Sequence, residues 1–104
     1  MDIKLTLKKK WFDMILSGEK IEEYRELKLY WERRFSKLLS KDYKGETIEN
    51  IHFFNGGHFS DKLPNFKIKF EGIEIRHGKQ KLGAENNKKY YVIKLGEIIQ
   101  KNNC

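Results

Sequence analysis

The sequence predicts one small α+β domain, residues 1–104, with a mostly antiparallel, barrel-like sheet and two helices near its N-terminal half. Strand-like and helix-like segments alternate at first, and three strand-like segments then follow with no helix between them. A parallel, doubly wound sheet would need helices between its later strands. The length is close to the commonest size of a single domain, so we expect no second domain.

The first two elements are a strand and a helix. Residues 2–7 alternate polar and apolar side chains, which predicts a strand with one buried face. Residues 8–17 predict a helix, because Trp11 and Ile15 lie one turn apart on the same helical face. Gly18 then suits the left-handed residue that commonly ends a helix.

A second strand and a second helix come next. Residues 20–27 predict a strand, and residues 28–39 predict a helix whose apolar stripe begins at Trp31. Residues 41–46 are polar and contain a glycine, which predicts a turn before a third strand at residues 47–54. Both helices are therefore expected in the first half of the chain.

The second half of the chain is expected to hold strands and loops. A loop at residues 55–65 precedes a strand at 66–76, and a polar loop at 77–89 precedes a last strand at 90–99. The alternation of apolar and charged side chains changes phase at Gly72. A shift of one residue at a glycine is typical of a β-bulge or sharp bend, which suits a closed or half-closed barrel.

The charge of the chain favours a polyanionic partner. The formal net charge is +7, with 22 Lys and Arg residues against 15 Asp and Glu residues. This excess favours RNA or DNA through the release of counterions. A Lys-rich solvated surface with no specific partner is the alternative explanation.

Several features favour a cytoplasmic protein. No apolar run approaches the roughly 18 residues that a membrane span needs, so no membrane partner is expected. The N-terminal stretch MDIKLTLKKKW lacks the apolar core of a signal peptide. The single cysteine, Cys104, cannot form an intrachain disulfide, which is compatible with a reducing compartment.

The predicted strand at residues 20–27 carries charges on both faces. One face holds two charged residues between two apolar ones, in the order Ile21, Glu23, Arg25 and Leu27. Because the two outer residues are apolar, we expect this face to be interior, with Glu23 and Arg25 directed inward. Buried charges are costly unless they are paired. Glu23 and Arg25 therefore form a structural ion pair, or they line a cleft that faces a polar ligand, with Lys20 at its mouth.

The stretch GEKIEEYR, residues 18–25, resembles the GxKxxExR signature of ASCH domains, which belong to the PUA-like superfamily. The flanking stretches KKKWFDMILSGEK and LKLYWERR and the closing YVIKLG extend this resemblance over essentially the whole chain. It implies a five- or six-stranded β-barrel with helices packed around it and a cleft beside the first helix. The signature residues of the family, Gly18, Lys20, Glu23 and Arg25, would line that cleft, which is suited to RNA or a modified base.

One functional hypothesis is a module that binds RNA, another nucleic acid or a modified nucleotide. Lys20 and Arg25 would contact a phosphate or a base edge, and Glu23 would orient Arg25 or accept from an exocyclic amine. Aromatic side chains could stack on an unpaired base or simply pack in the core, namely Tyr24, Tyr30 and Trp31. Further basic residues would add attraction that is independent of sequence, namely Lys8, Lys9, Lys10, Arg33 and Arg34.

The alternative hypothesis is a hydrolase that acts on a modified nucleoside or on RNA. Some bacterial proteins with ASCH folds resemble amidohydrolases that deacetylate 4-acetylcytidine, and a few relatives resemble RNA-cleaving enzymes. Lys20 matches the signature Lys of the deacetylating branch, but Glu23 occupies the position of its nucleophilic Thr. As an enzyme, the protein would use Lys20 and Glu23, with Glu23 acting as a general base on water. A third hypothesis is an accessory module that binds a small nucleotide or a protein.

No metal or cofactor is expected. The three histidines, His52, His58 and His77, are well separated and lack the spacing of metal ligands. His52 follows Ile51 on the opposite face of its predicted strand, where we expect it to be exposed. The sequence contains no P-loop, no dinucleotide-binding fingerprint and no GxSxG motif.

Overall fold

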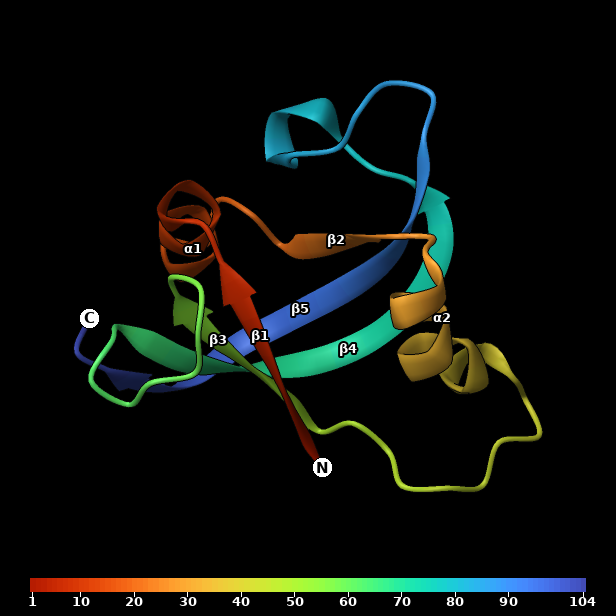
Figure 1. The fold of residues 1–104 in the computed structure, drawn as a ribbon, viewed down its shortest axis with the longest axis horizontal. Helices are drawn as coiled ribbons and strands as arrows, with labels where there is room; N and C mark the ends of the chain where they lie inside the picture. Colours follow the sequence, from red (N-terminus) through yellow and green to blue (C-terminus); the bar gives the residue numbers. More distant parts are fainter.

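The computed structural model describes residues 1–104 and contains one five-stranded mixed sheet with two α-helices (Figure 1). The strands are β1 (Asp2–Leu7), β2 (Glu22–Glu26), β3 (Asn50–Asn55), β4 (Asn65–His77) and β5 (Lys89–Asn102). The helices are α1 (Lys9–Leu16) and α2 (Leu29–Phe35), with short 3-10 helices η1 (Ser36–Leu39) and η2 (Gln80–Leu82). None of these helices combines the length and the apolar character that crossing a membrane requires. The predicted α+β class, with both helices in the first half, is confirmed.

The sheet is mostly antiparallel, as predicted, but it is open. Its strand order is β1-β3-β4-β5-β2, and only the β1–β3 pair is parallel. The prediction of a barrel is wrong, because the edge strands β1 and β2 do not pair with each other. Side chains occupy the space between them, where the Arg25 guanidinium donates to the Thr6 carbonyl oxygen at 3.0 Å in place of a ladder bond.

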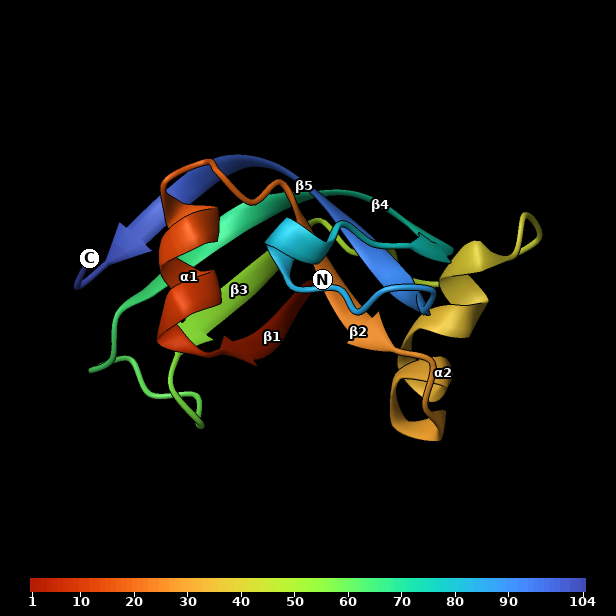
Figure 2. The same ribbon diagram turned by 90° about the horizontal axis from the view of Figure 1, so that it is seen from above.

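The sheet is strongly bent along its two longest strands. In Figure 2, β4 and β5 arch across the molecule, with α1 near one end and α2 near the other. The pairing of these strands shifts register at three points between Lys67 and Gly72, which confirms the predicted irregularity. Gly72 has a φ angle of +127°, which L side chains rarely adopt. The bend brings the far ends of β4 and β5 towards β2.

The core lies on the concave side of the sheet, under α1. Phe12 of α1 is buried, and its ring centroid lies 4.8 Å from that of Phe66. Aromatic and aliphatic side chains from β1, β3, β4, β5 and both α-helices complete this core, including Leu5, Ile15, Phe35, Ile51, Phe53 and Ile93. Burial of these side chains supplies the main driving force for folding. It also fixes α1 against β1 and β3, beside the gap between the sheet edges.

Several local predictions were wrong. The third strand begins at Asn50 rather than at residue 47, and the second α-helix ends at Phe35 and continues only as η1. Ile21 and Leu27, which we expected to be interior, are 56% and 46% exposed because β2 spans only the residues between them. His52 is buried rather than exposed, because it packs on the Phe54 ring and forms a 2.7 Å hydrogen bond with Asn65.

The bend at Gly72 can be tested by substitution. We expect Gly72→Ala to lower the free energy of unfolding by about 1–3 kcal/mol, because Ala is strained at this φ angle. Urea denaturation measures this change. Gly57→Ala is the matched control, since its backbone is not in the left-handed region and an added Cβ meets no atom within 4 Å. Equal stability of the two variants would show that the bend does not depend on Gly72.

Candidate functional site

A cleft of about 370 Å³ lies between the free edges of β1 and β2, beside α1 and η2. It contains all three charged residues of the GxKxxExR motif together with three large aromatic side chains. The lining residues are Thr6, Leu7, Lys8, Trp11, Lys20, Glu23, Tyr24, Arg25, Glu26, Trp31, Leu82 and Gly83. The open sheet therefore creates the cleft, because strand pairing at this edge would fill it.

Lys20 lies at the floor of the cleft, not at its mouth as the sequence suggested. The chain leaves α1 at Gly18, whose φ angle is +87°, and the Lys20 amide donates to the Met14 carbonyl oxygen at 2.9 Å. The side chain is only 1% exposed, and its ammonium group donates to the carbonyl oxygen of Leu82. Burial lowers the pKa of Lys20, and the nearby Glu23 carboxylate only partly opposes this shift.

Aromatic rings surround the Lys20 ammonium group. The nitrogen lies 5.1 Å from the centroid of the Trp11 ring and 4.6 Å from that of Tyr24. Cation–π contacts at these distances stabilise a partly desolvated charge. They offset some of the free energy that burial of Lys20 requires.

Glu23 lies between Lys20 and Arg25. Its Oε1 atom is 3.4 Å from Lys20 Nζ, and its Oε2 atom accepts a 2.8 Å hydrogen bond from Arg25 Nη2. We call these three residues the charged cluster. The sequence left open whether Glu23 and Arg25 form an ion pair or line a cleft. In the structure they do both.

Arg25 joins the charged cluster to both walls of the cleft. Its Nη2 atom donates to the Thr6 carbonyl oxygen of β1 as well as to Glu23. Its guanidinium carbon lies 5.0 Å from the centroid of the Trp31 ring. The Nε atom is buried and has no hydrogen-bond partner. An unsatisfied buried donor is uncommon in folded proteins, and one explanation is a group that binds nearby.

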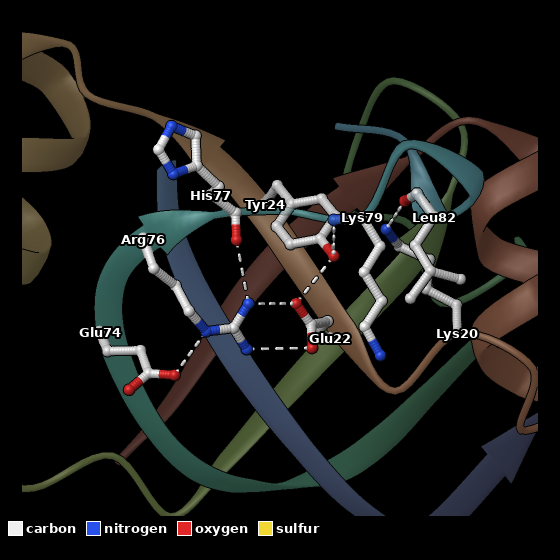
Figure 3. A network of polar contacts seen from close by, with 8 residues as sticks. All are labelled: Lys20, Glu22, Tyr24, Glu74, Arg76, His77, Lys79 and Leu82. Carbon is white, nitrogen blue, oxygen red and sulfur yellow. Dashed lines mark hydrogen bonds and ion pairs between the residues drawn. The ribbon is translucent and has the colours of Figure 1, made fainter. Parts of the chain in front are cut away.

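A second polar network fixes one side of the cleft (Figure 3). Arg76 donates from Nη1 and Nη2 to the two carboxylate oxygens of Glu22, at 2.9 and 3.1 Å, and from Nε to Glu74 at 2.6 Å. The Tyr24 hydroxyl donates to Glu22 at 2.7 Å and accepts from the backbone amide of Lys79 at 2.9 Å. The network therefore ties β2 to the loop that carries η2.

The network perturbs the titration of its members. Burial raises the pKa of the Glu22 carboxyl, but hydrogen bonds from Arg76 and Tyr24 outweigh this effect, so the net pKa is lowered. Burial also raises the pKa of the Tyr24 hydroxyl to about 12. Glu22 is therefore an anion and Tyr24 a neutral donor at neutral pH.

Two glycines allow the loop between β4 and β5 to approach the cleft closely. A Cβ atom at Gly78 would lie 2.7 Å from the Tyr24 ring, and one at Gly83 would lie 3.1 Å from the Trp11 ring. Gly83 also has a φ angle of +108°. The loop consequently presents the Leu82 carbonyl oxygen to Lys20 and covers one side of the cleft.

Of the other basic residues predicted for the site, three lie at or beside the cleft and two do not. Lys8 lines the cleft, and the Lys10 nitrogen lies 4.7 Å from the Trp11 ring centroid. The Arg34 guanidinium is 5.7 Å from the Trp31 ring centroid, and it donates to the Tyr30 hydroxyl at 2.9 Å. Lys9 instead pairs with Asp13, and Arg33 is exposed away from the cleft lining.

Sequence reasoning missed Arg76 and Leu82. Arg76 lies 54 residues from Glu22 in the chain, so only the tertiary fold shows their pairing. Leu82 acts through a backbone carbonyl, which its residue type does not reveal. The sequence placed both in regions read only as a strand end and a polar loop.

No set of three or more His, Cys, Asp or Glu side chains is arranged to hold a metal ion in the structure. Comparisons of the chain with protein-family models, curated proteins and solved structures gave no match. The ASCH resemblance and the function that it implies therefore stay predictions.

The Glu22 network gives a pH prediction. Because the Glu22 pKa is lower in the folded chain than its ordinary value of 4.5, the unfolded chain binds more protons just below that pH. The free energy of unfolding should therefore fall as the pH drops through this window. We expect Glu22→Gln to lose about 1–3 kcal/mol at pH 7, and this difference from the wild type to shrink in acid.

Urea denaturation between pH 7 and pH 3 measures these free energies. Glu71→Gln is the matched control, because Glu71 is exposed and forms no ion pair. A difference between wild type and Glu22→Gln that stays constant over this pH range would contradict the assigned role of the Glu22 charge.

Proposed function

We propose that the protein binds RNA, or a nucleotide or modified nucleoside related to it, in the cleft between β1 and β2. The observation that carries this proposal is the charged cluster at the floor of a cleft with aromatic walls, where Lys20 and Glu23 are buried and Arg25 is partly buried. The resemblance of residues 18–25 to the ASCH signature points to the same residues.

The composition of the charged cluster favours a ligand over a purely structural role. Glu23 and Arg25 would suffice for a structural ion pair, but Lys20 adds a second cation, whose side chain is only 1% exposed. The cluster thus has two positive groups and one negative group, and burial disfavours the charged form of Lys20. A ligand that supplies negative charge or hydrogen-bond acceptors would compensate this excess.

The aromatic lining favours a planar ligand. Trp11, Tyr24 and Trp31 line the cleft, and each of these rings already lies beside a cation of the cluster. Stacking of a base on an aromatic side chain is worth about 1–3 kcal/mol per base. The cleft volume of about 370 Å³ lies in the lower range of small-molecule sites. One base is therefore a reasonable occupant.

Basic residues at the rim would serve the backbone of a longer ligand. Lys8 and Lys10 lie on the α1 side, and Arg34 lies beside Trp31 on the α2 side. None of the three forms an ion pair with an acidic side chain. Phosphates on either side of a bound base could contact them without sequence preference.

The binding proposal is tested with single-stranded RNA and intrinsic fluorescence. The protein contains two tryptophans, and both line the cleft, so a stacked base should change their emission. We expect Lys20→Met to weaken binding about 10- to 100-fold, the worth of one charge-assisted hydrogen bond. Its stability should be unchanged or higher, because Glu23 and Arg25 still neutralise each other.

The matched control is Lys69→Met, which removes one exposed, unpaired positive charge outside the cleft. It should weaken binding by less than about threefold near physiological salt, as a screened surface charge does. Equal losses in the two variants, or binding that vanishes at physiological salt, would mean a general basic surface and no cleft site.

A hydrolase is the second candidate, and one observation favours it. Burial lowers the pKa of Lys20, which brings its amine closer to a proton-accepting form. Glu23 is a poor general base here, because Lys20 and Arg25 approach its two oxygens. The Tyr24 hydroxyl is engaged by Glu22 and Lys79. The geometry therefore supports binding better than hydrolysis.

Incubation of the protein with 4-acetylcytidine separates the two candidates. We expect no release of acetate above a buffer blank, because the cleft lacks an activated nucleophile. Acetate release by the wild type that is lost in Lys20→Met and kept in Lys69→Met would instead establish the hydrolase.

A further inference from the structure

The floor of the cleft has free hydrogen-bond donors. The Lys20 ammonium group directs one donor to Leu82 and lies beside Glu23, so one of its three hydrogens has no partner. Arg25 uses Nη2 for Thr6 and Glu23, which leaves its Nε–H and both Nη1 hydrogens without a partner. The buried Lys20 and the partly buried Arg25 thus retain unpaired donors, and the Arg25 Nε–H among them is fully buried.

The acceptors around these donors are already engaged. The carbonyl oxygens of Thr6 and Leu82 accept from Arg25 and Lys20. Each Glu23 oxygen faces one of the two cations. The Glu26 carboxylate likewise pairs with lysines, at 3.4 Å through Oε1 and at 3.1 Å through Oε2. The Thr6 hydroxyl is the exception, since a hydroxyl can either donate or accept.

We propose that the cleft selects a base with an oxo group at pyrimidine C4 or purine C6, as in uracil and hypoxanthine, over a base with an exocyclic amine at that position. This inference rests on the proposed function and adds the class of base. A carbonyl edge would accept from the free donors of Lys20 and Arg25. An amino group at the same place would set donor against donor and leave buried donors unpaired.

Phosphate offers the same acceptor chemistry, so it is the competing source of the ligand group. The aromatic walls favour the base, because Trp11, Tyr24 and Trp31 present apolar ring surface that a phosphate cannot use. Phosphates are expected instead at the rim, near Lys8, where water remains accessible. Nucleosides without phosphate therefore separate the two sources.

Two matched pairs of nucleosides test the proposal by tryptophan fluorescence. Uridine and cytidine differ in the oxo or amino group at C4, and inosine and adenosine differ in the same way at C6. We expect the oxo member of each pair to bind about tenfold tighter or more. Short homopolymers of uridine and cytidine repeat the comparison in RNA, and inorganic phosphate is titrated alone.

Variants show whether the preference comes from the named donors. Lys20→Met and Arg25→Lys should each reduce the preference to about threefold or less, the second because Lys lacks the planar fork of Arg. Lys69→Met should keep the full preference. Thermal unfolding of each variant verifies that it is folded. If Arg25→Lys is unstable, Lys20→Met alone shows whether the preference for the oxo base comes from these donors.

The outcomes separate this inference from the function on which it rests. Equal binding of oxo and amino bases, or a preference that both variants keep, would overturn the inference and leave RNA binding intact. RNA binding with phosphate but no nucleoside bound would mean a phosphate site, which overturns it as well. If neither RNA nor any nucleoside binds, the proposed function itself fails.

Discussion

The contact from Arg25 to the Thr6 carbonyl oxygen is the feature on which the site depends. It is the polar link between the two edge strands, and it joins them through a side chain instead of a ladder of backbone bonds. A paired edge would close the sheet and leave no room for a ligand. A wider gap would expose Lys20 to water. The higher dielectric would then weaken the interaction of its charge with a bound ligand. The cleft exists because the sheet curves far enough to bring its edges together but does not pair them.

The curvature of the sheet arises near Gly72, but it determines where Arg76 and Leu82 lie relative to β2 and the cleft. The irregular pairing near Gly72 turns β4 and β5, which carries Arg76 and the following loop to β2. Glu22 and Tyr24 then hold that loop in place. Leu82 thereby reaches Lys20, although the two residues are 62 positions apart. The geometry of the site consequently depends on the bend in β4 and β5.

Local patterns in the sequence were sufficient for the α+β class and for several residues that line the cleft, including Lys20, Glu23 and Arg25. Periodicity placed the helices and strands, and the phase shift at Gly72 indicated the bend. The interior position of Glu23 and Arg25 was predicted correctly, but from Ile21 and Leu27, which are exposed. The charges are buried because the opposite sheet edge and the loop cover them, not because apolar neighbours define a face. Closure of the sheet, the partner of Glu22 and the burial of His52 depend on contacts between distant segments, which no local pattern encodes.

The open edges also have a consequence for the behaviour of the protein in concentrated solution. An exposed strand edge can pair with the edge of another chain and begin aggregation, and native proteins limit this with short, charged edge strands. β2 has the sequence EEYRE, so four of its five residues are charged. Their side chains are already committed to internal partners, which makes realignment against a second copy unfavourable. The residues that shape the cleft thus also disfavour edge-to-edge pairing of the incomplete sheet, and we expect apolar replacements here to reduce solubility before they unfold the domain.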